Sequence, residues 1–449
     1  MTATQVPGPQ GSVLLGSLRE LRRDPLAAYL AARRDFGDVV RFTAGPVGMR
    51  VSFYALLSAE GAQHLLATRT AAFRKDHSFY NEVRDLIGNG LLTSQDDEYL
   101  RQRRLIQPLF TKKRVNEYAL AMAAETADLT KRWRDAPGGV VDVAEEMTGL
   151  TLRIVTRVLF GADGVFAEDA IKRSFPTLSE SVVRRGFSPL RLPRGLPTPQ
   201  NRRISAAQTA LYRVCDRIIA ERRGRDTEGV DLLSRLAQAG DSEDDRLSDP
   251  EIRDQVLVFL LAGHETTATS LAFALHLLAR NPEIQRRARE EIGTVLKDEP
   301  PSAADYERLP YTTMVVKEAM RLYPAAPILG RLAVDDTEVD GFRIPAGSNV
   351  LTSAWVIHRH PRYWEDPERF DPSRFTAERE AARPRYAWIP FGGGPRACIG
   401  QHFSMLESVL ALAVMLREYS FSAVDTEVKV RSGITLRAAG PLRCRIREH

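Results

Sequence analysis

The apolar stretch DQVLVFLLAGHETTATSLAFALHLLAR, residues 254–280, constrains the fold more than any other segment of this chain. Ser248, Pro250 and Glu251 predict a helix start with a capping box just before it, and Asn281–Pro282 predicts its end. About 30 residues of helix span roughly 45 Å, enough to cross a whole domain. Because its flanks are apolar, the sequence predicts one long buried helix through a large, mainly helical domain.

The middle of this helix carries residues that a buried helix normally avoids, GHETT at 263–267. Glycine costs about 1 kcal/mol relative to alanine in a helix, and threonine is a poor helix former. A buried, unpaired carboxylate costs more still. Either these residues face a solvated groove, or they mark a local distortion that opens a pocket for dioxygen. In the second interpretation Glu265 and Thr266 relay protons.

A glycine-rich segment, FGGGPRACIG at residues 391–400, precedes another apolar helical stretch. A cysteine near a helix N-terminus, as Cys398 is, has its pKa lowered by the helix dipole and by unpaired N–H groups. The glycines let the main chain approach a large flat ligand, and Arg396 could neutralise an acid group on it. The segment predicts a thiolate that ligates a metal in a cofactor, with haem iron the leading candidate. The alternative is a buried structural cysteine.

The spacing Phe–x–x–Gly–x–Arg–x–Cys–x–Gly resembles the haem-binding loop of the cytochrome P450 family, and AGHETT, residues 262–267, resembles its oxygen-activation motif. The resemblance covers essentially the whole chain. It implies the cytochrome P450 fold, mainly α with a smaller β portion, with the long central helix over haem b (iron protoporphyrin IX). Cys398 would be the iron ligand. Thr266 would hydrogen-bond the iron-bound peroxo group, and Glu265 would help to deliver protons. The resemblance also places Phe391, Arg396, Gly400 and Ala262 against the cofactor.

The segment KEAMRLYP, residues 317–324, puts Glu318 and Arg321 three apart on one helix face. Such a pair on a surface is worth only about 0.2–0.5 kcal/mol. Here it resembles the family's Glu–x–x–Arg pair, which joins an arginine in a Pro–Glu–Arg–Phe segment, residues 367–370 in this chain. The resemblance implies a network of Glu318, Arg321 and Arg369 that locks the core on the cysteine side of the haem.

The two haem propionates need cationic or hydrogen-bonding partners. Tyr99 and Arg103 lie four residues apart on one face of a predicted helix, although the family usually has tryptophan or histidine where Tyr99 stands. Arg331 and Arg396 match other propionate-binding arginines of the family. Any of these arginines could instead be an ordinary surface charge.

Family analogy also predicts a mostly apolar substrate pocket, which suits a hydrophobic organic substrate. Several of its residues could simply belong to the core. By the same analogy an arginine-rich loop, residues 184–203, would form part of a substrate lid. It could attract an anionic substrate or a membrane surface, or be a plain solvated loop. The predicted pocket residues are Phe79, Tyr80, Leu86, Ile87, Leu260, Ala262, Ala326, Pro327, Ile328, Leu329, Ile434 and Thr435.

No linker divides the 449 residues, so we expect one domain, residues 1–449, with β-rich portions at about 37–70, 325–375 and 419–446 and a helical portion at about 97–323. Three cysteines without CxxC spacing argue against disulfides or structural zinc. The N-terminus shows neither a signal-peptide layout nor an apolar run long enough to span a membrane. We therefore expect a soluble, cytoplasmic protein that binds no nucleic acid.

The sequence thus predicts a haem-thiolate monooxygenase that activates O2 and hydroxylates or epoxidises a hydrophobic small molecule. The expected substrate class is a terpenoid, polyketide or macrocycle of specialised metabolism. The sequence has no GxGxxG fingerprint of a flavin or nicotinamide site after a predicted strand, so electrons should come from separate proteins. By family analogy these are a ferredoxin and a ferredoxin reductase, with NAD(P)H used only indirectly. The alternatives are a peroxygenase or haem-thiolate isomerase, and a non-catalytic haem protein for electron transfer or gas sensing.

Overall fold

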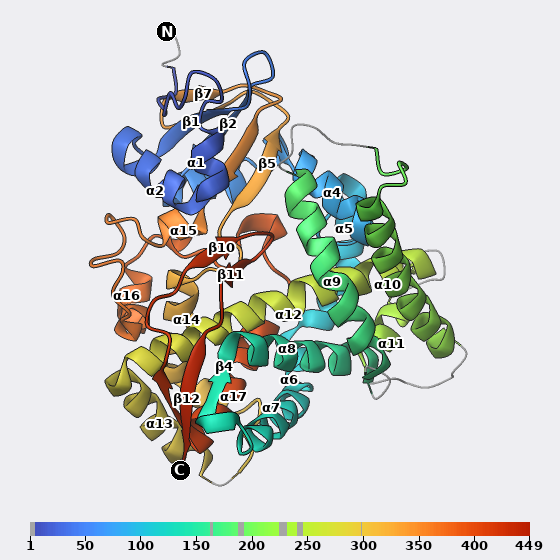
Figure 1. Cartoon of the computed structure of the whole chain (residues 1–449), viewed down its shortest axis with the longest axis vertical. Coiled ribbons are helices and arrows are strands. Elements are labelled where there is room, and N and C mark those ends of the chain that lie inside the picture. The colour runs from blue at the N-terminus through green and yellow to red at the C-terminus, as the bar shows by residue number, and fades with distance from the viewer. Residues whose placement is uncertain (1–4, 162–164, 187–192, 224–230, 240–245, 298) are drawn as a thin grey trace.

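The computed structural model describes residues 5–161, 165–186, 193–223, 231–239, 246–297 and 299–449. At its centre lies α12, Asp249–Arg280, a helix of 32 residues (Figure 1). Its start is fixed by a capping box, in which the Ser248 N–H donates to the Glu251 carboxylate at 2.8 Å. The predicted start and end of this helix are confirmed.

Helix α12 is the core helix of the molecule. Among the described helices it alone is long and apolar enough to cross a membrane, but 83% of its most apolar 18-residue stretch is buried inside the protein. Other helices and one strand pack directly on it. These are α8 (Val143–Phe160), α10 (Pro199–Arg223), α11 (Leu232–Gln238), α14 (Pro310–Leu322), α17 (Gln401–Glu418) and β9 (Tyr419–Ala423).

The other described helices extend this bundle or flank the N-terminal sheet. Side-chain caps fix several starts, for example Asp24 on α2 and Asp142 on α8. They are α1 (Leu18–Arg23), α2 (Pro25–Phe36), α3 (Ala59–Gln63), α4 (Ser78–Ile87), α5 (Asp96–Ile106), α6 (Lys112–Asn116), α7 (Ala119–Trp133), α9 (Val165–Gly186), α13 (Pro282–Leu296), α15 (Ala354–Ile357) and α16 (Ala377–Ala381).

The largest sheet, at the top of Figure 1, joins strands from the N-terminal region to strands between residues 329 and 352. Its order is β1-β2-β8-β5-β3, and only β2 and β8 run parallel, with Phe53 opposite Asn349. This sheet therefore carries segments from both halves of the chain towards one edge of the helical bundle. Its strands are β1 (Val39–Ala44), β2 (Val51–Leu56), β3 (Phe73–Arg74), β5 (Leu329–Ala333) and β8 (Asn349–Thr352).

Three smaller sheets complete the β portion, and two of them lie beside the bundle in Figure 1. The hairpin β10–β11 reaches α12, because the Thr269 hydroxyl donates to the Leu436 carbonyl at 2.9 Å. The strands are β4 (Val140–Asp142), β12 (Arg443–Glu448) and β9 in one sheet, β10 (Val430–Ser432) and β11 (Leu436–Ala438) in the second, and β6 (Thr337–Val339) and β7 (Phe342–Ile344) in the third.

The predicted fold class, mainly α with a smaller β portion, is confirmed. The predicted boundaries need four corrections: β3 and β4 lie outside the predicted β-rich portions, and residues 59–68 and 354–357 are helical inside them. Strands as short as β3 and β4 exist only through distant partners, β5 and β12, so they leave no local pattern in the sequence. That residues 1–449 form one domain stays a prediction.

Candidate functional site

The cysteine loop, residues 391–400, has a fixed shape. The Cys398 N–H donates to the Phe391 carbonyl at 2.9 Å and closes the loop on itself. Gly394 has a φ of +66°, and a Cβ at this position would lie 1.8 Å from the Leu66 carbonyl oxygen. Only glycine fits there. The loop therefore presents Cys398 in one defined position just before α17.

Helix α5 holds this loop through two of the predicted residues. The Tyr99 hydroxyl donates to the Pro395 carbonyl at 2.8 Å, and the Arg103 guanidinium donates to the Ala397 carbonyl at 3.0 Å. The Arg396 guanidinium lies 3.8 Å from the centre of the Tyr99 ring. The structure thus brings α5 and the loop together, and the Tyr99 hydroxyl faces the loop's own main chain.

Three cations form what we call the basic cluster: Lys75 and Arg331, which are buried, and Arg396, which is partly exposed. Lys75 and Arg331 are each only 7% exposed. Burial lowers the pKa of Lys75 well below its ordinary value, and the nearby Arg331 and Arg396 lower it further. Burial also lowers the pKa of Arg396, to about 10. The Cys398 thiol belongs to the same neighbourhood, because it acts on the Lys75 pKa in the opposite direction.

The basic cluster lacks counter-ions. Among the ion pairs of the described residues none includes Lys75, Arg331 or Arg396. The Arg396 Nη1 and the neighbouring Gln95 Nε2 are buried without a hydrogen-bond partner. Buried cations in this state are costly unless an anion joins them. A haem would supply two propionates for the cations and an iron for the thiolate, so these residues fit the group that the sequence predicts.

Sequence reasoning missed Lys75. It lies in the segment FRKDHSFY, residues 73–80, between β3 and α4, where no periodicity points inward. It becomes part of the site because β3 pairs with β5, with Phe73 opposite Ala333, and β5 carries Arg331. The one sequence feature that could have pointed to Lys75 is its position two residues after the hydrophobic Phe73, on the same side of an extended chain.

The Cys398 side chain is partly open to solvent, but neighbouring protein atoms remove most of the water around its sulfur. Loss of water raises the pKa of its thiol above the ordinary value. The Gly400 N–H, Arg103 and Lys75 lower it by smaller amounts. The N-terminal end of α17 thus lowers the pKa of this thiol as predicted, through the Gly400 N–H, but the loss of water outweighs that effect and leaves the pKa of the free thiol raised. A metal ion would remove the proton outright.

The predicted oxygen-binding face of α12 lies near this loop. The Thr267 hydroxyl is 3.1 Å from that of Ser404, in the first turn of α17. Ala262 is exposed and Thr266 is partly exposed, although their neighbours on α12 are buried. The Thr266 hydroxyl donates to the Ala262 carbonyl at 2.6 Å. These two residues therefore share one open face of an otherwise buried helix.

The predicted local distortion of α12 is absent. The helix continues through residues 263–267 without a break. Helices and strands packed along its length hold the regular geometry, which outweighs the poor helix propensity of glycine and threonine. The open face arises instead because Ala262 and Gly263 have little or no side chain.

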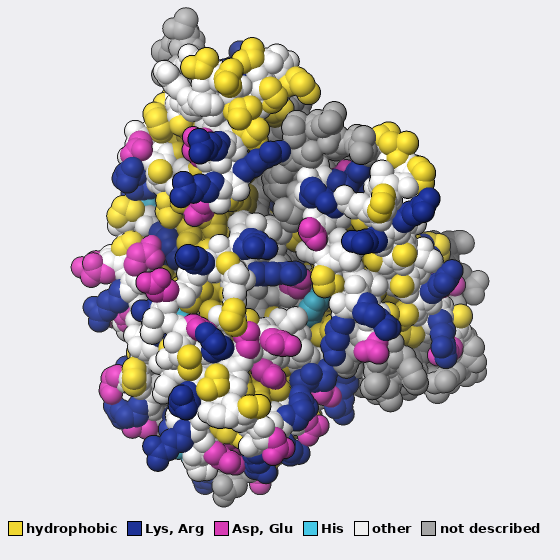
Figure 2. All heavy atoms as spheres, viewed as in Figure 1, with side chains coloured by type: hydrophobic (Ala, Val, Ile, Leu, Met, Phe, Trp, Pro, Cys, Tyr) yellow, Lys and Arg dark blue, Asp and Glu magenta, His cyan; other side chains and the backbone are white. Residues whose placement is uncertain are grey.

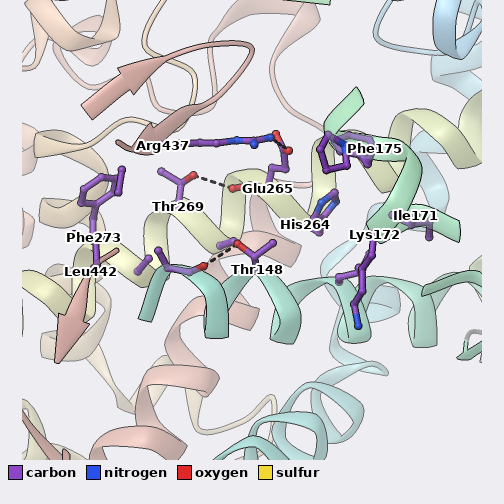
Figure 3. Close-up of a pocket in the computed structure, with 16 residues that line it drawn as sticks. Thr148, Ile171, Lys172, Phe175, His264, Glu265, Thr269, Phe273, Arg437 and Leu442 are labelled. Atoms are coloured by element: carbon purple, nitrogen blue, oxygen red, sulfur yellow. Dashed lines mark hydrogen bonds and ion pairs between the residues drawn. The ribbon is translucent and has the colours of Figure 1, made fainter. Parts of the chain in front are cut away.

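Glu265 is buried but fully partnered. Its carboxylate forms an ion pair with Arg437 (Figure 3). It also accepts the Thr435 hydroxyl at 2.8 Å, and both partners come from the β10–β11 hairpin. Thr269, one turn along α12, donates to the Glu265 carbonyl and to the hairpin. Among hydrogen bonds of the described residues none joins Glu265 to Thr266. The structure thus places the two predicted proton carriers on neighbouring faces of α12.

A cavity of about 270 Å³ borders Glu265 between α8, α9, α12 and β11 (Figure 3). Of the residues predicted for the site, only Glu265 lines it. His264 lines it too, with its ring edge-on to Phe175, its Nδ1 hydrogen-bonded to the Leu260 carbonyl and its pKa lowered by burial to about 4. His264 therefore does not face the side of α12 that carries Ala262.

Glu318 and Arg321 are both fully buried and form a bidentate ion pair, with N–O distances of 2.6 and 2.8 Å. The prediction that the Arg369 side chain completes this network is wrong. Arg369 is exposed and contributes only its carbonyl, to Arg321. The guanidinium that faces Glu318 is that of Arg374, at 3.4 Å. The chain has two Pro–x–Arg–Phe segments, 367–370 and 372–375, and sequence alone did not separate them.

Apart from Ala262, the predicted pocket residues fall into three groups: residues of the main core, partly exposed residues and other buried residues. Leu86, Ile87 and Leu260 lie in the packed main core, so the structure does not support them as lining an open pocket. Phe79, Ala326, Ile328, Leu329 and Ile434 are partly exposed, whereas Tyr80, Pro327 and Thr435 are buried. Leu329 also approaches the cysteine loop, where its Cδ1 would lie 3.8 Å from a Cβ at Gly392.

The predicted arginine-rich lid is described only in part, because residues 187–192 lie outside the described residues. Two of its arginines, Arg185 and Arg194, form ion pairs with the buried Glu82 of α4. They dock the ends of the loop onto α4, which argues against their serving to attract an anionic substrate.

Comparison with known proteins gives one consistent result. The family model described as cytochrome P450 matches residues 6–438. Pentalenene oxygenase of Streptomyces avermitilis is 36% identical over 98% of this chain and 96% of its own length. Cyclooctatin synthase of Streptomyces melanosporofaciens is 36% identical over 97% of this chain and 94% of its own.

A solved structure agrees with these matches. The haem domain of cytochrome P450DA superposes with a TM-score of 0.90 and 29% sequence identity, over 100% of this chain and 99% of that one. The similarity therefore includes every element that carries the cysteine loop, the basic cluster and the open face of α12.

Proposed function

Since the chain belongs to the cytochrome P450 family and is a haem-dependent monooxygenase that uses O2, we propose that it hydroxylates or epoxidises a terpenoid of specialised metabolism. The observation that carries this substrate class is the full-length similarity to pentalenene oxygenase and to cyclooctat-9-en-7-ol 5-monooxygenase, each at 36% identity. The apolar and partly exposed Phe79, Ile328 and Leu329 suit such a substrate.

The proposal is tested by incubating the haem-loaded protein, a ferredoxin, its reductase and NADPH with a panel of compounds. Terpenes, including pentalenene, are compared with polyketide macrolactones of similar size. Oxygenated terpene products with none from the macrolactones would support it. Product from macrolactones alone would overturn the substrate class while leaving the monooxygenase assignment intact.

We propose that Cys398 holds the haem iron and that the basic cluster holds the propionates. Bound haem would supply the activation of dioxygen and the attack on an unactivated C–H bond. The protein contributes a fixed loop, three cations that offset the propionate charges, and the open face of α12 that carries Ala262 and Thr266. These contacts orient the cofactor, and the side chains around them exclude water.

Lys75→Met should weaken haem binding, because it removes one buried cation from the basic cluster. A charge-assisted hydrogen bond of this kind is worth about 1.5–3 kcal/mol, so haem should transfer to apomyoglobin roughly 10–100-fold faster. Arg74→Met, the neighbouring residue with a half-exposed side chain, is the matched control and should leave the rate unchanged. Equal rates in both variants would contradict a role of Lys75 at the propionates.

We propose that Glu265 and Thr266 control proton supply. Glu265 borders both the cavity of Figure 3 and the half-exposed Arg437, so its carboxylate can exchange protons with water there. Thr266 lies on the open face, where its hydroxyl can release the Ala262 carbonyl and donate to a ligand. A rotation of the Glu265 side chain or a bridging water would connect the two groups.

Thr266→Ala should uncouple oxygen consumption from product formation, because the hydroxyl that positions the proton is lost. Product formed per O2 consumed should fall at least about tenfold, with the difference released as hydrogen peroxide. Thr266→Ser keeps the hydroxyl and should retain most of the coupling. An oxygen electrode with a peroxide assay measures both, and normal coupling in the alanine variant would remove Thr266 from the proton route.

We propose that a ferredoxin supplies the electrons and docks beside the cysteine loop. Helix α6 packs on α17 there, and His402 is hydrogen-bonded to Asn116 at 2.9 Å. Lys112 and Lys113 of α6 are exposed. An acidic ferredoxin would complement this surface.

The full-length similarity to bacterial relatives also supports a soluble protein, in keeping with the predicted cytoplasmic location.

A further inference from the structure

Two neighbouring loops at the N-terminal end of the molecule expose what we call the apolar tip. It accounts for six of the eleven large hydrophobic side chains that are exposed in the described part of the chain. Figure 2 shows hydrophobic side chains gathered at the top of the view, where Figure 1 places the end of the β1–β2 hairpin. The apolar tip consists of Val13 (86% exposed), Leu14, Leu15, Val47, Met49 and Val51.

The two loops are joined by main-chain hydrogen bonds. The Gly45 N–H donates to the Leu15 carbonyl at 3.1 Å, and the Ser17 N–H donates to the Thr43 carbonyl at 2.8 Å. The first loop is closed by a reciprocal pair of bonds between Ser12 and Gly16, at 2.9 and 2.8 Å. The apolar tip is therefore a built feature, in which hydrogen bonds hold hydrophobic side chains outward on a defined scaffold.

Arginines predominate around the apolar tip. Within the two tip segments, residues 11–24 and 44–51, Arg19, Arg22, Arg23 and Arg50 are exposed, against two exposed carboxylates, Glu20 and Asp24. The Arg50 guanidinium also donates to the Val13 carbonyl and so ties the charge to the tip itself. Figure 2 shows Lys and Arg side chains on the surface just below the hydrophobic group. The excess of arginine in these two segments complements a negatively charged surface.

We propose that the apolar tip docks reversibly on an anionic lipid bilayer. Patches of exposed apolar side chains mark contact sites for proteins or membranes. These side chains project from the tips of two turns, with arginines set behind them, which matches shallow insertion among acyl chains with cations at headgroup depth. A bilayer is where an apolar substrate collects, but the docking does not depend on the proposed substrate class.

The test is flotation of the full-length, haem-loaded protein with vesicles of equal parts phosphatidylglycerol and phosphatidylcholine. The wild type should float with these vesicles, less so at high salt, and less with phosphatidylcholine alone. The variant Val13→Ser/Val47→Ser/Met49→Ser should bind at least about tenfold more weakly. The matched control, Leu100→Ser/Leu120→Ser/Val424→Ser, removes three exposed apolar side chains elsewhere and should bind like the wild type.

Unchanged circular dichroism and Soret spectra would show that the variants are folded. Failure of the wild type to float would overturn the proposal, and so would equal flotation of the tip variant. Sedimentation of the same samples without vesicles tests the alternative that the apolar tip binds a second copy of this chain. Self-association that the tip variant abolishes, without vesicle binding, would make the apolar tip an interface between copies of this chain.

Discussion

Replacing Cys398 with alanine is expected to abolish both the thiolate signature and the monooxygenase activity. The dithionite-reduced, carbon monoxide-bound wild type should show a strongly red-shifted Soret band, because the thiolate donates electron density to iron. The variant should lack that band and show less than about 1% of the wild-type turnover, since no other thiol is placed to replace it. The loop itself should survive, because Gly394 and the main-chain hydrogen bonds that fix it do not involve the sulfur.

The matched control is Cys444→Ala. Cys444 is buried, and burial raises the pKa of its thiol to about 12, so it is a neutral, structural side chain. Its loss should lower stability slightly and leave the red-shifted band in place. A red-shifted band that persists in Cys398→Ala would overturn the ligand assignment. Loss of the band in both variants would point instead to general misfolding, which circular dichroism would reveal.

The second large effect is expected at Arg374. Glu318 has a fully buried side chain and faces two guanidinium groups, those of Arg321 and Arg374. Removing one partner of a buried ion pair costs about 3–5 kcal/mol. Arg321→Gln should therefore largely prevent folding, and Arg374→Gln should lower the free energy of unfolding by about 1–3 kcal/mol, since one guanidinium remains.

Arg369→Gln is the control that separates the two Pro–x–Arg–Phe segments. Its exposed side chain is not needed for the carbonyl that accepts from Arg321, so the free energy of unfolding should change by less than about 0.5 kcal/mol. Urea denaturation followed by circular dichroism measures the Arg374 and Arg369 variants, and the circular dichroism spectrum without urea shows whether Arg321→Gln folds. A larger loss in Arg369→Gln than in Arg374→Gln would contradict the network seen in the structure.

The comparison of these two arginines shows where a sequence motif stops being informative. Both segments have the same residue pattern, separated by five positions. The difference arises because a short helical turn at Pro372–Phe375 directs Arg374 inward, where it is only 7% exposed. Sequence pattern specifies that an arginine is needed, whereas the path of the chain decides which one is used.

The same limit applies to the predicted pocket and to Glu265. Leu86 and Ile87 have the right chemistry for a pocket but pack in the core. Glu265 has the chemistry of a proton carrier, yet no local pattern in the sequence indicates that Thr435 and Arg437 hold it. These partners come from a hairpin 170 residues away in the chain.

The sequence by itself determined the family, the fold class, the long central helix with its capped start, and the cysteine, because each rests on local patterns of burial, capping and motif spacing. Only the tertiary structure decided the surroundings. The basic cluster joins residues 75, 331 and 396 through the pairing of β3 with β5 and the folding of the cysteine loop. Desolvation then sets the thiol pKa, and burial is a property of the whole packed molecule.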